Sequence, residues 1–231
     1  EPWLWIYLLF IVSVSALILF LFSLKIPDNK SDSEKFDFRI FSSFLKSRFS
    51  YFYFFGIFCY VGVEQGINNW SSEFLYQYHS LDPAVVGVEV ISAFWGNLTI
   101  GTVINLFLIK LFDEKKLLNF YAISSSIIIL LALHSYSEVS VISFKILGFS
   151  ISGIWSLMIS LGLNSVPKNH SIFTGILLTG IVGGAFFPFI IAGLGQLFNL
   201  KVGMHIILLG FIYLSYVGFN AKPLIKNKIL I

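Results

Sequence analysis

Long apolar runs separated by short polar stretches make up most of this chain. Seven of the runs reach the roughly 20 residues that a helix needs to cross about 30 Å of hydrocarbon. Because each run is long and almost continuously apolar, the pattern predicts membrane-spanning helices rather than strands or a soluble core. The predicted spans are 3–24, 50–72, 84–109, 116–134, 139–164, 171–198 and 202–220.

The polar stretches divide these spans unevenly, because one span is followed by the polar segment 25–49 and then by six spans with short loops. The later part of that segment is amphipathic, with phenylalanines that alternate with basic residues. This pattern leaves open a solvated connector or a helix that lies in the membrane interface. The residues concerned are Phe36, Phe38, Phe41 and Phe44 with Arg39, Lys46 and Arg48.

Lysines and arginines fall on one side of the membrane if the predicted spans alternate in direction. Thirteen of the fifteen basic residues share that side, whereas Lys201 lies on the other and Lys145 lies inside a span. Basic loops face the cytoplasm, so segment 25–49 and the C-terminus are predicted to be cytoplasmic. The thirteen are Lys25, Lys30, Lys35, Arg39, Lys46, Arg48, Lys110, Lys115, Lys116, Lys168, Lys222, Lys226 and Lys228.

The composition agrees with a membrane environment. Hydrophobic residues make up 57% of the 231 residues and charged residues only 12%, about half the charged share of an ordinary soluble domain. The sequence contains no nucleotide-binding loop and no hydrolase or metalloprotease motif, and its one cysteine, Cys59, excludes a disulfide framework. We therefore expect a membrane protein that is not an enzyme and has no cofactor, no metal site and no nucleic-acid partner.

Three ionisable residues inside the predicted spans are candidates for function, because a charge in lipid costs roughly 2.5–3.5 kcal/mol on insertion scales. Glu64, Glu89 and Lys145 are each predicted to lie roughly 8–9 Å below the outer interface, at 1.5 Å per residue. At one depth they would form a gate or ion-pair cluster. Alternatively, Lys145 extends to the interface and Glu89 simply belongs there.

Helical faces indicate which polar residues point inward. At 100° per residue, Glu64 and Asn68 share one face of the second span, whereas Gly62 and Gly66 lie opposite, where small residues allow close packing. Tryptophan rings stack on the apolar faces of sugars, and amides bind hydroxyls. The predicted substrate-binding residues for an uncharged, hydroxylated solute are Glu64, Asn68, Trp95, Asn97 and Ser156.

Two further spans carry small or polar residues at regular spacing. In the fifth span a stripe of small and polar side chains either packs on a neighbouring helix or lines a wet cavity. In the sixth span Gly180 and Gly184 have the spacing of a close helix contact, and Pro188 follows. The stripe consists of Lys145, Ser152, Gly153, Ser156, Ser160 and Asn164.

Several motifs, in order and at matching spacing, resemble a known transporter family over residues 50–220. They are Tyr60-Val-Gly-Val-Glu64 with Trp70, Ser92-Ala-Phe-Trp-Gly with Gly101, Leu147-Gly-Phe, and Gly183-Gly-Ala-Phe-Phe-Pro188 with Gly193. The chain is similar to the C-terminal half of a major facilitator superfamily transporter. Within that superfamily it resembles the fucose/galactose/glucose:proton symporter (fucose permease-like) family most.

The resemblance implies an all-α integral membrane bundle of about seven transmembrane helices, one plus a six-helix C-terminal half. It assigns 1–24 to the last helix of an N-terminal half, 25–49 to a cytoplasmic linker, 50–222 to the C-terminal bundle and 223–231 to a cytoplasmic tail. Because the first residue is Glu1 rather than methionine, we expect the chain to be part of a longer product whose N-terminal half is missing.

The function that the resemblance implies is proton-coupled uptake of a sugar by alternating access in the cell membrane. The partners would be the sugar, protons, the lipid bilayer and the missing half. The alternatives are an efflux or drug carrier of the same superfamily, whose site would be more apolar, and a truncated membrane module that does not transport.

Overall fold

The computed structural model describes residues 4–23 and 37–225, and its contacts divide the chain into two units, residues 1–35 and 36–231. Each unit is described by itself. The structure does not describe residues 24–36 of the predicted linker or residues 226–231 of the predicted tail.

The first unit contains one helix, α1 (Leu4–Ser23). Its 20 residues are almost all apolar, and none of them is buried within this unit. Length and composition alone make α1 a candidate membrane span. A helix that exposes so much apolar surface needs lipid or another protein around it.

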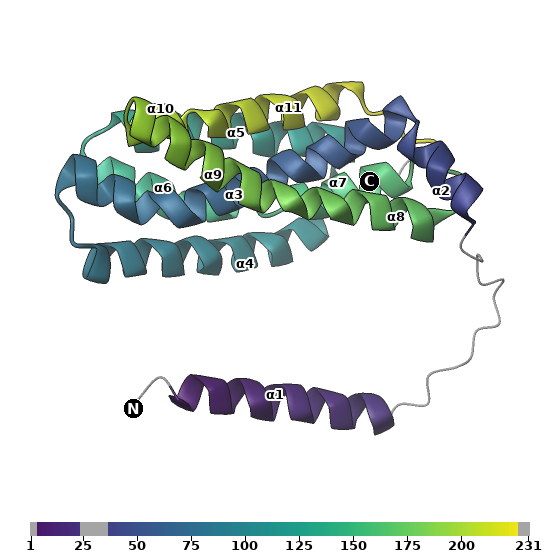
Figure 1. The fold of residues 1–231 in the computed structure, drawn as a ribbon, viewed down its shortest axis with the longest axis horizontal. Coiled ribbons are helices and arrows are strands. Elements are labelled where there is room, and N and C mark those ends of the chain that lie inside the picture. The colour runs from purple at the N-terminus through teal and green to yellow at the C-terminus, as the bar shows by residue number, and fades with distance from the viewer. Residues whose placement is uncertain (1–3, 24–36, 226–231) are drawn as a thin grey trace. The chain divides into compact units, whose positions relative to one another are not determined.

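The second unit is a bundle of helices whose axes run along one common direction (Figure 1). Every predicted span from residue 50 onward is helical, although the fifth and sixth are interrupted, the third begins with a π-helical turn and the seventh has a break at His205. The helices are α2 (Phe38–Leu45), α3 (Arg48–His79), α4 (Val88–Leu111), α5 (Glu114–His134), α6 (Ser137–Ile151), α7 (Ile154–Leu163), α8 (His170–Leu178), α9 (Gly183–Leu197), α10 (Leu200–Met204) and α11 (Ile206–Asn220), with a π-helical turn η1 (Pro83–Gly87) and a 3-10 turn η2 (Thr179–Val182).

The interruptions of the fifth and sixth spans lie at small residues. The fifth predicted span breaks at Ser152 and Gly153, between α6 and α7, and the sixth passes through η2 between α8 and α9. Glycine is a poor residue for a helix interior. Gly153 at the first interruption and Gly180 in η2 also lie where a neighbouring helix comes close. A Cβ at Gly153 would lie 2.3 Å from the Tyr121 ring, and one at Gly180 would lie 2.9 Å from the Phe54 carbonyl oxygen.

Six helical segments in the described residues are long and apolar enough to cross a membrane, namely 4–23, 83–111, 114–134, 137–163, 170–197 and 200–220. The second predicted span is the exception, because α3 has 32 residues but is not among these six. Its packing explains the difference. α3 contacts α9 and α11 extensively and also touches α4, α6, α7 and α8. An inner helix is shielded by its neighbours and can therefore carry more polar residues.

Glycines set the close contact between α3 and α9, as the sequence predicts. A Cβ at Gly62 would lie 2.2 Å from the Phe187 ring, and one at Gly66 would lie 3.0 Å from Ile191. α9 also contributes a glycine to this contact, because a Cβ at Gly183 would lie 2.0 Å from the carbonyl oxygen of Phe58. The predicted small-residue face of α3 is therefore a helix–helix interface.

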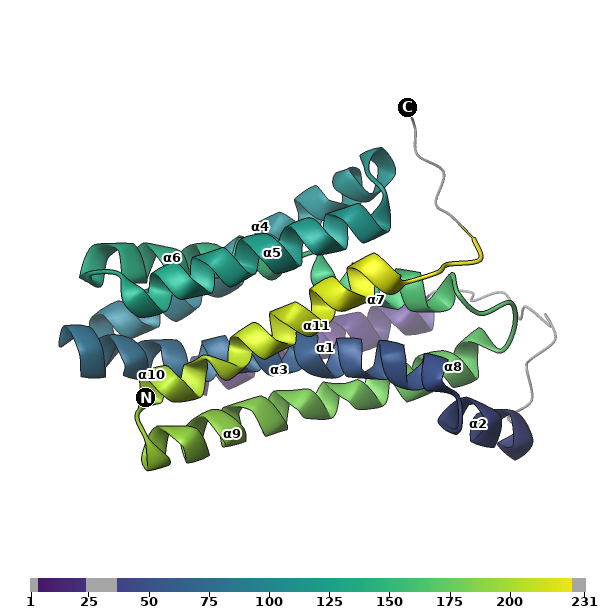
Figure 2. The ribbon, with the colours of Figure 1, turned by 90° about the horizontal axis from the view of Figure 1, so that it is seen from above.

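Basic residues gather at one end of the second unit. The N-terminal ends of α3, α5 and α8 meet the C-terminal ends of α4, α7 and α11 there, as two perpendicular views show (Figures 1 and 2). Lys201 belongs to α10 at the opposite end, and Lys145 lies within α6. The described basic residues on or beside the basic end are Arg39, Lys46, Arg48, Lys110, Lys115, Lys116, Lys168 and Lys222.

The described part of the amphipathic segment forms the short helix α2. Asp37 caps its N-terminus by accepting a 2.7 Å hydrogen bond from the Arg39 backbone N–H. The centroids of the Phe44 and Phe173 rings lie 5.3 Å apart, so α2 packs against α8. Residues 38–45 of the amphipathic segment are therefore helical.

Candidate solute-binding site

Two predicted solute-binding residues are joined directly by a hydrogen bond. The indole Nε1 of Trp95 in α4 donates to Oδ1 of Asn68 in α3 at 2.8 Å. Trp95 is 37% exposed, and Asn68 is partly exposed. The Asn68 side chain forms no other hydrogen bond within the described residues, so its NH₂ group offers donors next to an accessible aromatic ring.

Glu64 lies one turn before Asn68, at the midpoint of α3. Its carboxylate accepts a 3.4 Å hydrogen bond from Gln65 Nε2, and the Tyr60 hydroxyl lies close to it. Glu64 and Gln65 are both partly exposed, whereas Tyr60 is 4% exposed. One face of α3 near its midpoint is therefore polar and partly accessible.

Glu89 and Lys145, the other two residues of the predicted cluster, form an ion pair with each other. Lys145 Nζ lies 2.5 Å from Glu89 Oε1, and the two side chains are 23% and 63% exposed. Glu89 stands in the first turn of α4, whereas Glu64 is at mid-helix, so the two carboxylates lie at different levels along the bundle. Of the three predicted members, the structure brings together Glu89 and Lys145 and leaves Glu64 with Tyr60 and Gln65.

Asn97 is used in packing between α4 and α6. Its Nδ2 donates to the backbone oxygen of Lys145 at 2.9 Å. This bond fixes α4 beside α6 next to the Glu89–Lys145 pair. Asn97 is partly exposed.

Ser156 belongs to a hydrogen-bonded network between helices rather than to the α3–α4 face. Its hydroxyl accepts from Asn105 Nδ2 at 3.0 Å, and Asn105 Oδ1 accepts from the Tyr121 hydroxyl at 3.1 Å. Asn105 is 1% exposed and Tyr121 is 3% exposed. The polar stripe of the fifth span thus packs on α4 and α5 at this level, which favours the packing alternative over the wet cavity.

Farther along the same stripe, Ser160 donates a hydrogen bond to the carboxylate of Glu114, and Asn164 donates to Ser160 at 3.3 Å. Glu114 opens α5 and is 5% exposed. Sequence reasoning did not select Asn105, Tyr121 or Glu114. The signal available for Asn105 was its amide inside a predominantly apolar span, which it shares with Asn97.

Two other tryptophans, Trp70 and Trp155, make contacts between helices of the bundle. Trp70 Nε1 donates to the backbone oxygen of Pro188 at 3.2 Å and so joins α3 to α9. The centroids of the Trp155 and Tyr60 rings lie 6.0 Å apart, and the angle between the ring planes is 49°. Trp155 is partly exposed and therefore adds an aromatic surface close to Glu64.

Taken as chemistry, the accessible face of α3 and α4 offers an aromatic ring, amide donors and acceptors, and one carboxylate. Such a set binds hydroxyl groups and stacks on an apolar sugar face. It contains no nucleophile paired with a base, which is the arrangement that covalent catalysis requires.

No protein-family model matches the chain. Two curated sequences are similar to it. The glucose/galactose transporter of Brucella abortus biovar 1 (strain 9-941) is 26% identical over 218 residues, which are 92% of this chain and 52% of that protein. The putative glucose/galactose transporter of Helicobacter pylori (strain J99) is 28% identical over 176 residues, 74% of this chain and 42% of that protein. The chain thus spans about half the length of these relatives.

A solved structure has the same fold. The E. coli fucose:proton symporter FucP matches with a TM-score of 0.81 and 18% identity over 94% of this chain and 54% of that one. A second structure of FucP, a major facilitator superfamily transporter in the outward conformation, matches with a TM-score of 0.77. The resemblance inferred from the motifs is confirmed: the chain is a relative of the glucose/galactose transporters and has the fold of half of a major facilitator superfamily transporter, as expected for a C-terminal half.

Proposed function

We propose that the chain is the C-terminal half of a secondary active transporter that takes up a sugar together with protons by alternating access. The fold and the relatives support the general class, a sugar transporter of the major facilitator superfamily. In this proposal α1 is the last helix of the N-terminal half, 25–49 is a cytoplasmic linker, 50–222 is the C-terminal bundle and 223–231 is a cytoplasmic tail.

The observation that carries the proposal is the Trp95–Asn68 hydrogen bond of 2.8 Å. It fixes the orientation of an accessible ring at the α3–α4 contact and leaves amide donors beside it. A sugar ring would stack on Trp95 and donate or accept hydrogen bonds at Asn68 and Glu64. The other half of the transporter would close the site from the opposite side.

The orientation in the membrane follows from charge. The basic end of the bundle carries eight described lysines and arginines, whereas Lys201 stands at the other end. We place the basic end and the C-terminus in the cytoplasm. The α3–α4 polar face then runs between the two sides of the membrane, as a solute path requires.

The test uses the full-length transporter and the 231-residue chain, each purified and placed in liposomes. With an inward proton gradient we expect the full-length protein to concentrate glucose, galactose or fucose, and a protonophore to abolish accumulation. The chain alone should not accumulate sugar, because half the site is absent. Accumulation of sugar by the chain alone would contradict the assignment to a half-transporter.

Thermal unfolding of the full-length protein separates the competing functions. Stabilisation by one of these sugars, and not by mannitol or by hydrophobic cations, supports sugar transport. Stabilisation by hydrophobic cations alone would indicate an efflux carrier. Absence of any solute effect, together with co-purification of a stable partner, would indicate a membrane module that does not transport.

A further inference from the structure

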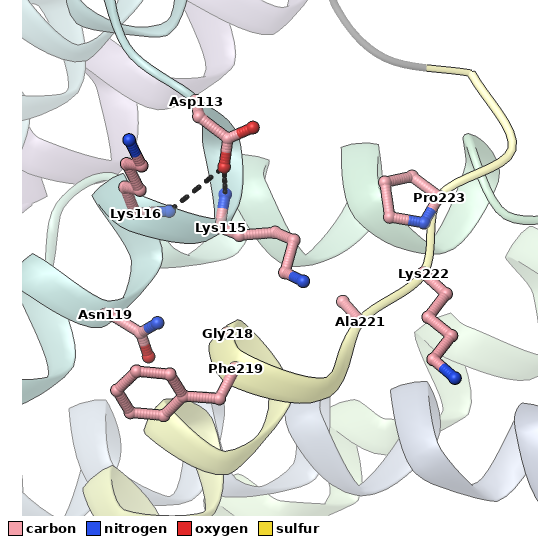
Figure 3. A pocket seen from close by; sticks show the side chains of 9 residues that line it. All are labelled: Asp113, Lys115, Lys116, Asn119, Gly218, Phe219, Ala221, Lys222 and Pro223. Carbon is pink, nitrogen blue, oxygen red and sulfur yellow. Dashed lines mark hydrogen bonds between the residues drawn. The ribbon is translucent and has the colours of Figure 1, made fainter.

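A cavity of about 490 Å³ opens at the basic end, where the start of α5 faces the end of α11 and the residues after it. Figure 3 shows Lys115 reaching into this space, with Lys222 and Pro223 on the wall across from it. Asn119 and Phe219 line the side nearer to the bundle. The cavity is distant from the α3–α4 face, since it lies at the helix ends.

The charge of this cavity is positive. It is lined by three lysines, Lys115, Lys116 and Lys222, and by one carboxylate, Asp113. Asp113 caps α5, because its Oδ1 accepts from the backbone N–H groups of Lys115 at 3.0 Å and Lys116 at 3.3 Å. In the described part of the chain none of the three lysines forms an ion pair; the ion pair found there joins Lys145 and Glu89.

The cavity also offers an amide donor. Asn119 Oδ1 accepts a 3.2 Å hydrogen bond from Ser215, which leaves the nitrogen side of the amide for other partners. A Cβ at Gly218 would lie 2.4 Å from Asn119 Oδ1, so α11 approaches α5 closely at this point. Ammonium groups and an amide N–H around one space are the donors that bind phosphate oxygens.

An apolar groove of about 430 Å³ adjoins the charged cavity on the outside of α4 and α5. Lys116 lines both spaces, and Figure 3 shows its side chain turned away from that of Lys115. Phe112 is 52% exposed and Phe120 is 64% exposed. The groove is lined by Leu108, Phe112, Lys116, Leu117 and Phe120.

We propose that these two adjoining spaces bind one anionic glycerophospholipid. The phosphate and headgroup lie in the charged cavity between Lys115 and Lys222, Lys116 stands at the border of the two spaces, and an acyl chain lies along the groove past Phe112 and Phe120. Basic pockets between helices on the cytoplasmic side of a membrane are suited to such headgroups. The bound lipid would join the ends of α4, α5 and α11.

The apolar groove distinguishes a lipid from a free anion. Inorganic phosphate would use only the lysines, whereas a lipid uses the lysines and the groove at once. Lys116 is placed for this double role, because it lines both spaces and combines an aliphatic stem with a charged ammonium group.

The experiment measures lipid binding to the purified 231-residue chain in detergent, by native mass spectrometry and by thermal shift. The probes are dioleoyl phosphatidylglycerol, dioleoyl phosphatidylcholine, dihexanoyl phosphatidylglycerol and inorganic phosphate. We expect the long-chain anionic lipid to bind, and the other three to bind at least tenfold more weakly.

Three variants test the site. The triple variant K115Q/K116Q/K222Q should weaken binding of the anionic lipid roughly tenfold to a hundredfold. The matched control K46Q/K110Q/K168Q removes the same charge from the same end and should change binding less than threefold. D113N keeps a capping side chain but removes the opposing charge, so it should strengthen binding.

Equal losses in the triple variant and its control would overturn the proposal, because they would show a diffuse charge effect. Equal binding of inorganic phosphate and the long-chain lipid would also overturn it, in favour of a free-anion site. D113N keeps the proposal testable if the triple variant does not fold, because unchanged or weaker lipid binding in D113N contradicts it. No sugar is used, so the outcome is independent of the proposed transport function.

Discussion

Trp95 in α4 and Asn68 in α3 are 27 residues apart in sequence and share a hydrogen bond of 2.8 Å. This bond determines both the orientation of the indole ring and the direction of the amide. Any solute that stacks on the ring therefore meets the Asn68 NH₂ group. Neither residue alone would define such a position.

Replacing Asn68 with alanine should weaken sugar binding to the full-length transporter. The change removes the acceptor for Trp95 and the donors for the solute, and we expect about a tenfold loss, which corresponds to roughly 1.4 kcal/mol. The measurement is the sugar-dependent thermal shift. The matched control is Asn220→Ala, because Asn220 is an exposed amide that donates only to Tyr216 of its own helix in the described residues. Equal effects of the two variants would remove Asn68 from the site.

The Glu89–Lys145 pair should contribute little to stability. Both side chains are partly exposed and Glu89 lies in the first turn of α4, so we expect water at the membrane interface to reach the pair, and water-exposed ion pairs contribute about 0–1 kcal/mol. We expect E89Q, K145Q and the double variant to give a coupling energy below about 1 kcal/mol in a double-mutant cycle. If sugar uptake nevertheless falls by tenfold or more in both single variants, the pair acts as a gate. Unchanged uptake would assign both residues to the interface.

Gly148 inside α6 and Gly96 inside α4 should respond oppositely to alanine. A Cβ at Gly148 would lie 1.9 Å from the Phe94 backbone oxygen, so G148A must push α4 and α6 apart. We expect it to lower the unfolding free energy by roughly 1–3 kcal/mol. G96A is the matched control, because no atom lies within 4 Å of the added Cβ. It should raise helix stability by about 0.5–1 kcal/mol, and thermal unfolding of the chain in detergent measures both changes.

Buried hydroxyls provide a second matched pair. Ser50 Oγ is buried and has no hydrogen-bond partner among the described residues, so S50A should leave stability unchanged or raise it. Ser125 is equally buried but shares a 2.7 Å hydrogen bond with Ser150, so S125A should cost about 1 kcal/mol. A loss in S50A as large as that in S125A would mean that Ser50 has a partner outside the described residues.

The sequence predicts the helices of this protein well, because apolar runs of about 20 residues have few alternatives. The opposite faces of Gly62 and Glu64 follow from the helical repeat and agree with the contacts of α3 with α9. Partners across the bundle do not follow from the repeat. Lys145 and Glu89 could be paired only after α4 and α6 were placed side by side, and the level of Glu64 depended on α3 extending to His79.

The candidate site was predicted in part. Asn68 and Trp95 were selected for their chemistry, and their hydrogen bond adds a geometry that composition cannot supply. Ser156 was selected because it lies on a polar stripe. In the structure its hydroxyl accepts a hydrogen bond from Asn105. A stripe on one helix shows that its residues avoid lipid, but only the neighbouring helices decide whether they meet a solute or another side chain.

The polar composition of α3 has a consequence for biogenesis. During synthesis α3 emerges before α9 and α11, which are its main contacts and lie more than 100 residues later in the chain. A segment that carries Glu64 and several amides is a weak candidate for independent insertion into the bilayer. We therefore expect α3 to be retained near the insertion machinery until those later helices arrive, so that truncation before α9 would leave it exposed to quality-control proteases.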